Sequence, residues 1–347
     1  MDQLKRGARY LDLRVGSRRK DSTLVDDAII IHGVLKGAPF ANIIDEIEKF
    51  LMDNANEFLI VEIAVDPSKH NMSSVLRFQV LQLISTTFSQ MITTEDMDSW
   101  FNLNKVTLGQ LSEKKRNVLI LINDGFCKEF TYDDTHYDQS TIARDFNCHK
   151  NANFMANKWH NTSHAGILLR SNELYLDEGC NNCDVFVNSQ FVMTPQPPSG
   201  VGDVLGLLIG AKSLRPVSLA RELYRKDLLE VFIRDNAEKR WNIVMLDFVD
   251  LCPQLVKFLI GLNSTKQLKI KEASVASKDC STNLDVTETI NDLKRRNNCV
   301  YILDFEKDLK ISIHEGILTV KAQYDNEECV DHVVPFNKDT EYLLCNI

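Results

Sequence analysis

The feature that most constrains this fold is the alternation of short apolar runs with amphipathic segments over the first 260 residues. Runs typical of strands cover 10–15, 28–32, 57–65, 117–122, 184–194 and 242–249. Segments with the apolar period of a helix cover 41–54, 75–86, 219–236 and 253–261. Strands separated by helices predict a parallel α/β sheet, and this many units favour a distorted (β/α) TIM-type barrel.

The character of the sequence changes after Gly261. Residues 263–298 begin with a polar run and end with a short helical pattern, so we predict a linker and a short helix there. Short strand-like runs then cover 300–305, 317–324, 329–334 and 342–345. We therefore predict a barrel over 1–262 and a small β-rich C-terminal extension over 299–347. Within the barrel, residues 125–183 show little periodicity, which is typical of a long functional loop.

Charge and hydropathy exclude several classes of protein. The chain has 40 Lys and Arg residues against 49 Asp and Glu residues, which gives a net charge of −9. This balance argues against a nucleic-acid partner and against general attraction to anionic membranes. No apolar run reaches the roughly 18–20 residues that a membrane span requires, so we predict no transmembrane segment.

The compartment can be interpreted in two ways. The first residues lack the apolar stretch of a signal peptide, which favours the cytoplasm. Nine cysteines and three glycosylation acceptor motifs, at Asn71, Asn161 and Asn263, favour a secreted or lumenal glycoprotein with disulfides. A leader that this sequence does not contain would reconcile the two interpretations, and cytoplasmic localisation stays as the alternative.

Two of the nine cysteines lie close enough in the sequence to be candidate metal ligands. Cys180 and Cys183 form one Cys-x-x-Cys pair, with His160 and His164 nearby. A structural zinc site usually needs two such pairs, so a loop disulfide or free thiols are favoured over zinc. We predict no metal and no cofactor.

Three polar residues follow predicted strands and form the candidate site. Arg14 and His32 end two early strands, and Asp247 ends a late one. Polar residues at the C-terminal ends of barrel strands line the active site, and the late strand of a closed barrel neighbours the first ones. The three side chains are therefore expected to converge.

This trio suits the cleavage of a phosphodiester. Arg presents a permanent charge with a bidentate geometry that fits a phosphoryl group. His donates a proton to a leaving alkoxide near neutral pH, and Asp holds a partner His in the required tautomer. Asp12 lies in the same strand as Arg14, where the alternatives are an ion pair with Arg9 or a loop cap.

These residues carry a resemblance to a known family. The run from Gln3 to Val15, QLKRGARYLDLRV, followed by His32-Gly33, resembles the phosphatidylinositol-specific phospholipase C X-domain family of lipid metabolism. Other segments fit in order over about residues 2–260: Phe50-Leu51 with 57–62, Thr107-Leu108-Gly109 leading to 118–123, Trp159 to Thr162, Thr194-Pro195 and 241–247. The resemblance implies a distorted barrel that cleaves a phospholipid at a membrane surface.

The resemblance also implies roles for individual residues. His32 matches the general acid, Arg14 the charge-stabilising Arg of metal-independent members, and Asp247 the carboxylate that pairs with the general base. Asp12, Glu62 and Asn123 are expected to contribute polar groups to substrate binding.

This sequence also departs from the family pattern. The family's first catalytic His lies in a His-Asp motif upstream of the strand that ends at Arg14, and no His precedes His32 here. The first barrel strand is expected to be missing with it. Ala64 and Asn123 stand where bacterial members carry Lys and Arg. Two functions therefore stay open: a metal-independent phosphoric diester hydrolase, and a catalytically inactive barrel that binds lipid or a partner. A glycerophosphodiesterase-like metal enzyme is less favoured, because clustered metal carboxylates are not visible.

Overall fold

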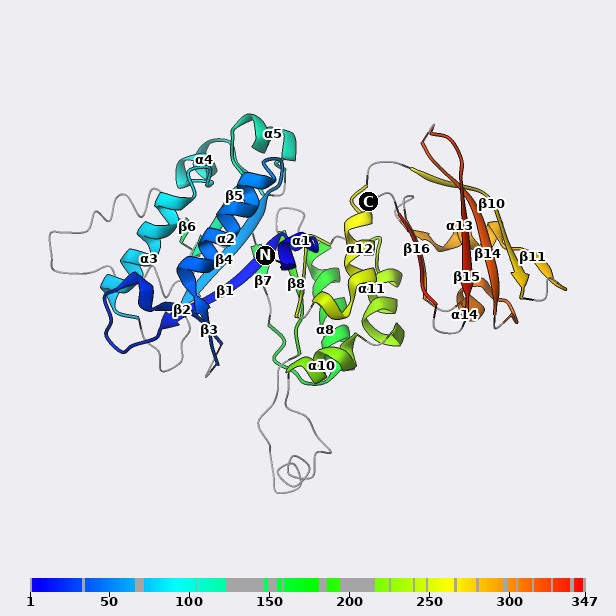
Figure 1. Ribbon diagram of the computed structural model, residues 1–347, viewed down its shortest axis with the longest axis horizontal. Coiled ribbons are helices and arrows are strands. Elements are labelled where there is room, and N and C mark those ends of the chain that lie inside the picture. The colour runs from blue at the N-terminus through cyan, green and yellow to red at the C-terminus, as the bar shows by residue number, and fades with distance from the viewer. Residues whose placement is uncertain are drawn as a thin grey trace, which may run out of the picture. The chain divides into compact units, whose positions relative to one another are not determined.

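The computed structural model describes residues 2–32, 35–65, 72–103, 105–122, 147–148, 155–157, 159–180, 186–193, 216–224, 226–239, 241–247, 249–264, 267–278, 281–295, 299–303, 305–313, 315–325, 327–337 and 340–345. The chain divides into two compact units (Figure 1). The first holds residues 1–156 and 183–186, and the second holds 157–182 and 187–347. No helix among the described residues is long and apolar enough to cross a bilayer.

The first unit is built on a six-stranded sheet in the order β3-β2-β1-β4-β5-β6. Its strands are β1 (Tyr10–Ser17), β2 (Ala28–His32), β3 (Leu35–Pro39), β4 (Leu59–Val65), β5 (Val118–Ile122) and β6 (Asn147–Cys148). The pairs β1–β4, β4–β5 and β5–β6 are parallel, whereas β1–β2 and β2–β3 are antiparallel. The predicted parallel pairing is confirmed for β1, β4 and β5 and is wrong for β2, which pairs antiparallel with β1. β3 is an additional strand with too few apolar residues to show a pattern.

Two long helices cover one face of this sheet (Figure 1). They are α2 (Phe40–Asp53) and α3 (Ser74–Thr87), and shorter helices are α1 (Asp2–Lys5), α4 (Thr94–Ser99) and α5 (Leu108–Glu113). In α2 the buried residues Ile44, Ile47 and Leu51 recur every three or four positions, which forms one apolar stripe. This stripe packs in one core with inward-facing residues of β4 and β5, namely Leu59, Val61, Ile63, Val118, Ile120 and Ile122.

A buried carboxylate, Asp96, holds the start of α4 in place. Its side chain accepts hydrogen bonds from the backbone of Thr93 at 2.9 Å, from the indole of Trp100 at 2.9 Å and from Nε of Arg116 at 2.8 Å. Burial alone would raise the pKa of Asp96, but the hydrogen bonds from Thr93, Trp100 and Arg116 outweigh burial and lower the pKa. The charged carboxylate is therefore the form that stabilises the fold.

Substitution of Asp96 by Asn is expected to lower the free energy of unfolding at pH 7 by about 2 kcal/mol, the typical contribution of hydrogen bonds to a charged group. A folded-state pKa below the unfolded value gives stability that is present above the unfolded pKa and lost as the pH falls through the folded one. The difference between wild type and Asp96→Asn in urea unfolding should therefore shrink below about pH 4. Asp98→Asn, at an exposed position of the same helix, is the matched control. An equal loss at pH 7 and pH 3 would contradict the assignment.

The second unit begins with a helical part. β8 (Phe186–Phe191) pairs in parallel with β9 (Ile243–Leu246). The short strand β7 (Met155–Asn157) spans the boundary between the first unit and residues 157–182 of the second. The helices are α8 (Ala165–Cys180), α10 (Pro216–Leu223), α11 (Val231–Asp235) and α12 (Pro253–Gly261). The helical prediction over 219–236 is confirmed for α10 and α11, and a π-helical segment at Lys226–Glu230 leads directly into α11.

Helix α8 lies inside the region that shows little apolar periodicity. Asn172 is fully buried on its inner face, between the buried residues Leu168 and Leu176. The Asn172 side-chain amide donates to the carbonyls of Leu168 and Gln190, at 3.0 Å each. Asn172 thus occupies an inward position as a hydrogen-bonded polar residue. It interrupts the apolar pattern of the inner face, so the sequence pattern does not predict this helix.

The C-terminal part contains two sheets and two helices. One sheet has the order β11-β10-β14-β15 and the other β12-β13-β16. Their bounds are β10 (Leu268–Ser277), β11 (Asn283–Asp285), β12 (Lys294–Arg295), β13 (Cys299–Ile302), β14 (Gly316–Tyr324), β15 (Val330–Phe336) and β16 (Tyr342–Cys345), with helices α13 (Thr287–Leu293) and α14 (Phe305–Leu309). The predicted linker interpretation is wrong for 268–277, because this polar-looking run is the ten-residue strand β10.

The β13–β16 pair is buried on both faces. Val300 and Ile302 of β13 point into a core shared with β10 and β14. Cys299 and Tyr301, which alternate with them, belong to the core that contains α12 residues Leu255 and Phe258. One sheet therefore separates two cores of the same unit and contributes to each.

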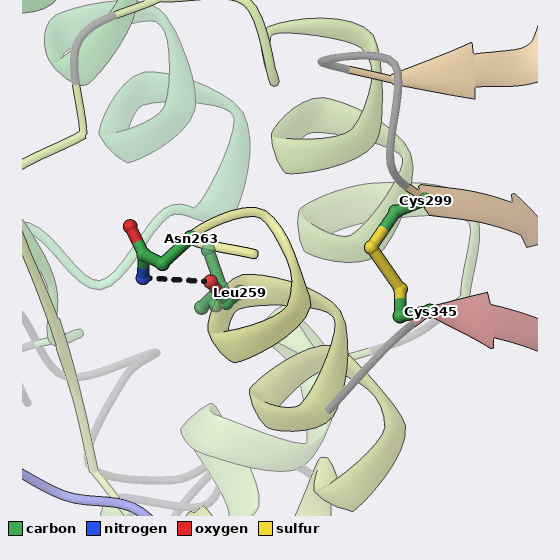
Figure 2. Close-up of a disulfide and its surroundings, with 4 residues drawn as sticks. All are labelled: Leu259, Asn263, Cys299 and Cys345. Carbon is green, nitrogen blue, oxygen red and sulfur yellow. Dashed lines mark hydrogen bonds between the residues drawn. A yellow bond between two sulfur atoms is a disulfide. The ribbon is translucent and has the colours of Figure 1, made fainter. Parts of the chain in front are cut away.

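A disulfide lies where this sheet meets α12. Cys299 of β13 is bonded to Cys345 of β16, 46 residues later (Figure 2). A Cβ atom on Gly261, the last residue of α12, would lie 2.6 Å from Cβ of Cys345 and 2.7 Å from both sulfur atoms. Only glycine lets the helix end approach the disulfide this closely. The prediction that the cysteines form a disulfide is confirmed for this pair.

Candidate functional site

The face of the first sheet opposite α2 and α3 carries polar side chains. The parallel register sets Asp12 of β1 beside Glu62 of β4, and Arg14 beside Ala64. Tyr10 lies two residues before Asp12, so the strand alternation gives it the same face. We call Tyr10, Asp12, Arg14 and Glu62 the polar face. The intervening residues of both strands, such as Leu11 and Val61, contribute to the core on the other side.

Contacts within the polar face leave its arginine accessible. The hydroxyl of Tyr10 donates to Oε2 of Glu62. Nη2 of Arg14 lies 3.7 Å from Oδ2 of Asp12, and the Arg14 side chain is 45% exposed. An ion pair this exposed is weak, so the guanidinium is available to an anionic ligand. Arg9 instead forms its ion pair with Glu57, at 2.7 Å, and therefore does not require Asp12.

Three predicted site residues remain: His32, Asn123 and Asp247. His32 is the last residue of β2, and its backbone pairs with Leu35. Asn123 lies outside the described residues. The structure thus brings Asp12, Arg14 and Glu62 to one face of one sheet. Arg14 and His32 belong to the first unit and Asp247 to the second, so the convergence of these three stays a prediction.

Asp247 follows β9 and is half-buried. Its backbone carbonyl accepts a hydrogen bond from the hydroxyl of Tyr224, a buried residue just after α10. Burial, followed by the acidic neighbours Cys252, Asp247 and Asp250, raises the pKa of Tyr224. The phenol therefore remains protonated and keeps donating, which fixes the backbone where the chain leaves β9.

The buried thiol near this turn is not activated. Burial and the carboxylates of Glu230 and Asp250 raise the pKa of Cys252 to about 12. A thiol in this state is a poor nucleophile and a poor metal ligand. Within the part of the chain that the structure describes, no group of three or more His, Cys, Asp or Glu side chains is placed to hold a metal ion.

The parallel β1–β4 register places the exposed Arg14 among polar side chains of β1 and β4, whereas Leu119 and Leu121 of β5 are buried on the same face of the sheet. The strands β1, β2, β4 and β5 also lie within the part of the chain that matches a known family model. Residues 1–123 match the family model of the phosphatidylinositol-specific phospholipase C X domain. The X-domain match includes Asp12, Arg14, His32, Glu62 and Asn123, but not Asp247.

Solved structures of phosphatidylinositol-specific phospholipases C have low sequence identity to this chain. The phosphatidylinositol-specific phospholipase C from Listeria monocytogenes is 16% identical, with a TM-score of 0.47, over 76% of this chain and 81% of that one. A mutant of the enzyme from Staphylococcus aureus is 11% identical, with a TM-score of 0.47, over 74% and 81%. Among curated proteins, none matches this chain.

Sequence reasoning missed two residues, one in each unit. Tyr10 alternates with Asp12 and Arg14, so a period-two reading of β1 places it on the polar face beside Glu62. Tyr224 gives no such signal, because its bond to Asp247 joins residues 23 positions apart through tertiary packing.

Proposed function

We propose that this protein is a phosphoric diester hydrolase or lyase of the phosphatidylinositol-specific phospholipase C type. The proposal is carried by the X-domain match over residues 1–123, whose central strands present an exposed Arg14 on the polar face. Its substrate would be a phospholipid at a membrane surface, cleaved between the glycerol oxygen and the headgroup phosphorus.

In this proposal the guanidinium of Arg14 binds two phosphoryl oxygens and stabilises the charge that grows on them. A headgroup hydroxyl attacks the phosphorus, and His32 gives a proton to the departing glycerol oxygen. The attacking hydroxyl would give its proton to a general base oriented by Asp247, a role to which no residue of this sequence is assigned. Asp12, Glu62 and Asn123 would contact the headgroup. No metal or cofactor takes part, because Arg14 supplies the charge that a cation would otherwise provide.

The larger arrangement is part of the same proposal. The parallel strands β1, β4, β5 and β6 and the parallel pair β8–β9 would form parts of a distorted barrel over 1–262. Residues 263–298 and 299–347 would form the connection and the C-terminal extension. The disulfide supports a secreted or lumenal location over a cytoplasmic one.

The alternative is a barrel that binds lipid or a protein partner without cleaving it. Its motivation is that no residue of this sequence is assigned as the general base that Asp247 would orient. Loss of a residue that acts as part of a catalytic unit lowers the rate by several orders of magnitude.

Vesicles of phosphatidylinositol and phosphatidylcholine separate these functions. We expect the chain to release water-soluble inositol phosphate, and we expect release to continue when a chelator removes divalent cations. Loss of release with the chelator would contradict metal independence and favour the metal-dependent enzyme. Vesicle binding without release would support the non-catalytic alternative. If the chain neither binds the vesicles nor releases inositol phosphate, both proposals are contradicted.

A further inference from the structure

The acceptor motif at Asn263 is not used by the proposed reaction. Asn263-Ser264-Thr265 begins two residues after the last residue of α12. This motif is the recognition sequence for N-linked glycosylation in the secretory pathway. Because such motifs also occur by chance, its position in the fold has to show whether a glycan fits.

The side chain of Asn263 is open to solvent. The residue is exposed, and its amide donates to the carbonyl of Leu259 at 3.4 Å, which is a long hydrogen bond (Figure 2). The backbone N–H of Asn263 donates to Ile260, so the main chain is fixed independently of the side chain. A sugar on Nδ2 would displace only this long bond to a helix-end carbonyl, which water can satisfy.

The other motifs differ from this one. Asn71 lies outside the described residues. Asn161 is exposed, but its φ of 43° lies in the left-handed region, which asparagine tolerates better than most residues. The backbone therefore gives a reason for asparagine at 161. The backbone at 263 has no positive φ, so the conformation that favours asparagine at 161 does not apply there.

A second observation points to the compartment where glycans are added. The Cys299–Cys345 disulfide lies against Gly261, two residues before Asn263 (Figure 2). Structural disulfides form and persist in the lumen of the endoplasmic reticulum and outside the cell. The acceptor asparagine and the disulfide are therefore both consistent with passage of the chain through the secretory pathway.

We propose that Asn263 carries an N-linked glycan. In the transfer, Nδ2 of Asn263 forms a bond to C1 of the first sugar of a polyprenyl-diphosphate-linked oligosaccharide. The bond between C1 and the diphosphate oxygen breaks, the polyprenyl diphosphate leaves, and a carboxylate of the transferase takes the proton from Nδ2. This inference rests on the proposed secretory localisation and not on catalysis.

The test uses the full chain behind a cleavable leader, translated in the presence of microsomes. Only chain that resists added protease, and has therefore entered the lumen, is analysed. We expect a mass shift that peptide-N-glycosidase reverses, and we expect the peptide that contains Asn263 to carry the sugar. Asn263→Gln should remove one glycan and leave the thermal unfolding midpoint unchanged.

Two variants of the third motif position sharpen the result. Thr265→Ser keeps a hydroxyl and should keep the glycan, whereas Thr265→Ala should lose it. Lumenal wild-type chain with an unmodified Asn263 peptide would overturn the proposal, even if Asn71 or Asn161 is modified. Native chain from its source that carries the free thiols of both Cys299 and Cys345 and no glycan would instead overturn the secretory localisation on which the proposal rests.

Discussion

The His32→Ala variant is expected to cleave phosphatidylinositol about 10²–10⁴-fold more slowly than the wild-type chain, which is the usual contribution of a positioned general acid. The leaving group is an alkoxide of high pKa, so its departure without a proton is slow. The measurement is the initial rate of inositol phosphate release from mixed vesicles, at equal vesicle binding.

A substrate that needs no general acid separates this role from a structural one. A phosphodiester of the same headgroup with an aryl leaving group of low pKa should be cleaved by His32→Ala at nearly the wild-type rate. His332→Ala, in β15 of the C-terminal part, is the control for loss of an imidazole elsewhere. Equal losses on the lipid and on the aryl substrate would show that His32 is not the acid.

Removal of the Cys299–Cys345 disulfide is expected to lower the free energy of unfolding of the second unit by about 4 kcal/mol. The bond closes a loop of 46 residues, and chain-entropy estimates for loops of 15 to 100 residues run from about 3 to about 4.7 kcal/mol. The double variant Cys299→Ala/Cys345→Ala should show this loss in urea unfolding.

Reductant provides the internal control. The wild-type chain should lose about the same stability when reduced, and the double variant should not respond to reductant. Cys329→Ser replaces an exposed free thiol and is expected to change stability by less than about 0.5 kcal/mol. A double variant as stable as oxidised wild type would show that packing alone holds β13 and β16 together.

Elements with an uninterrupted apolar pattern were predictable from the sequence. The expected limits of 28–32, 253–261 and 342–345 coincide with β2, α12 and β16. In each, local periodicity and burial agree, because the apolar residues are also those that enter a core. The end of α12 at Gly261 also follows a local rule, since glycine commonly marks helix ends.

The prediction failed where polar residues take inward positions or lie between inward ones. In β10, the exposed residues Lys269, Lys271 and Glu272 separate the inward residues, and a register shift between Ile270 and Glu272 breaks the alternation. The same reason hides α8, whose inner face contains the hydrogen-bonded Asn172. The average hydropathy of such a stretch combines inward and exposed positions, so the stretch is predicted as a linker or a loop.

The candidate site was predictable as far as a single strand determines it. Alternation in β1 places Asp12 and Arg14 together, and the β1–β4 register adds Glu62. The Tyr224 bond to the carbonyl of Asp247 depends on the approach of α10 to the turn after β9. No pattern within either segment encodes that approach, so only tertiary structure shows it.

The position of β16 has a consequence for the order in which the protein is made. Tyr342 and Leu344 enter one core of the second unit, and Leu343 and Cys345 pack against the other. During synthesis both cores stay incomplete until this strand has emerged from the ribosome. Loss of β16 would therefore leave two hydrophobic interiors of the second unit incomplete at once.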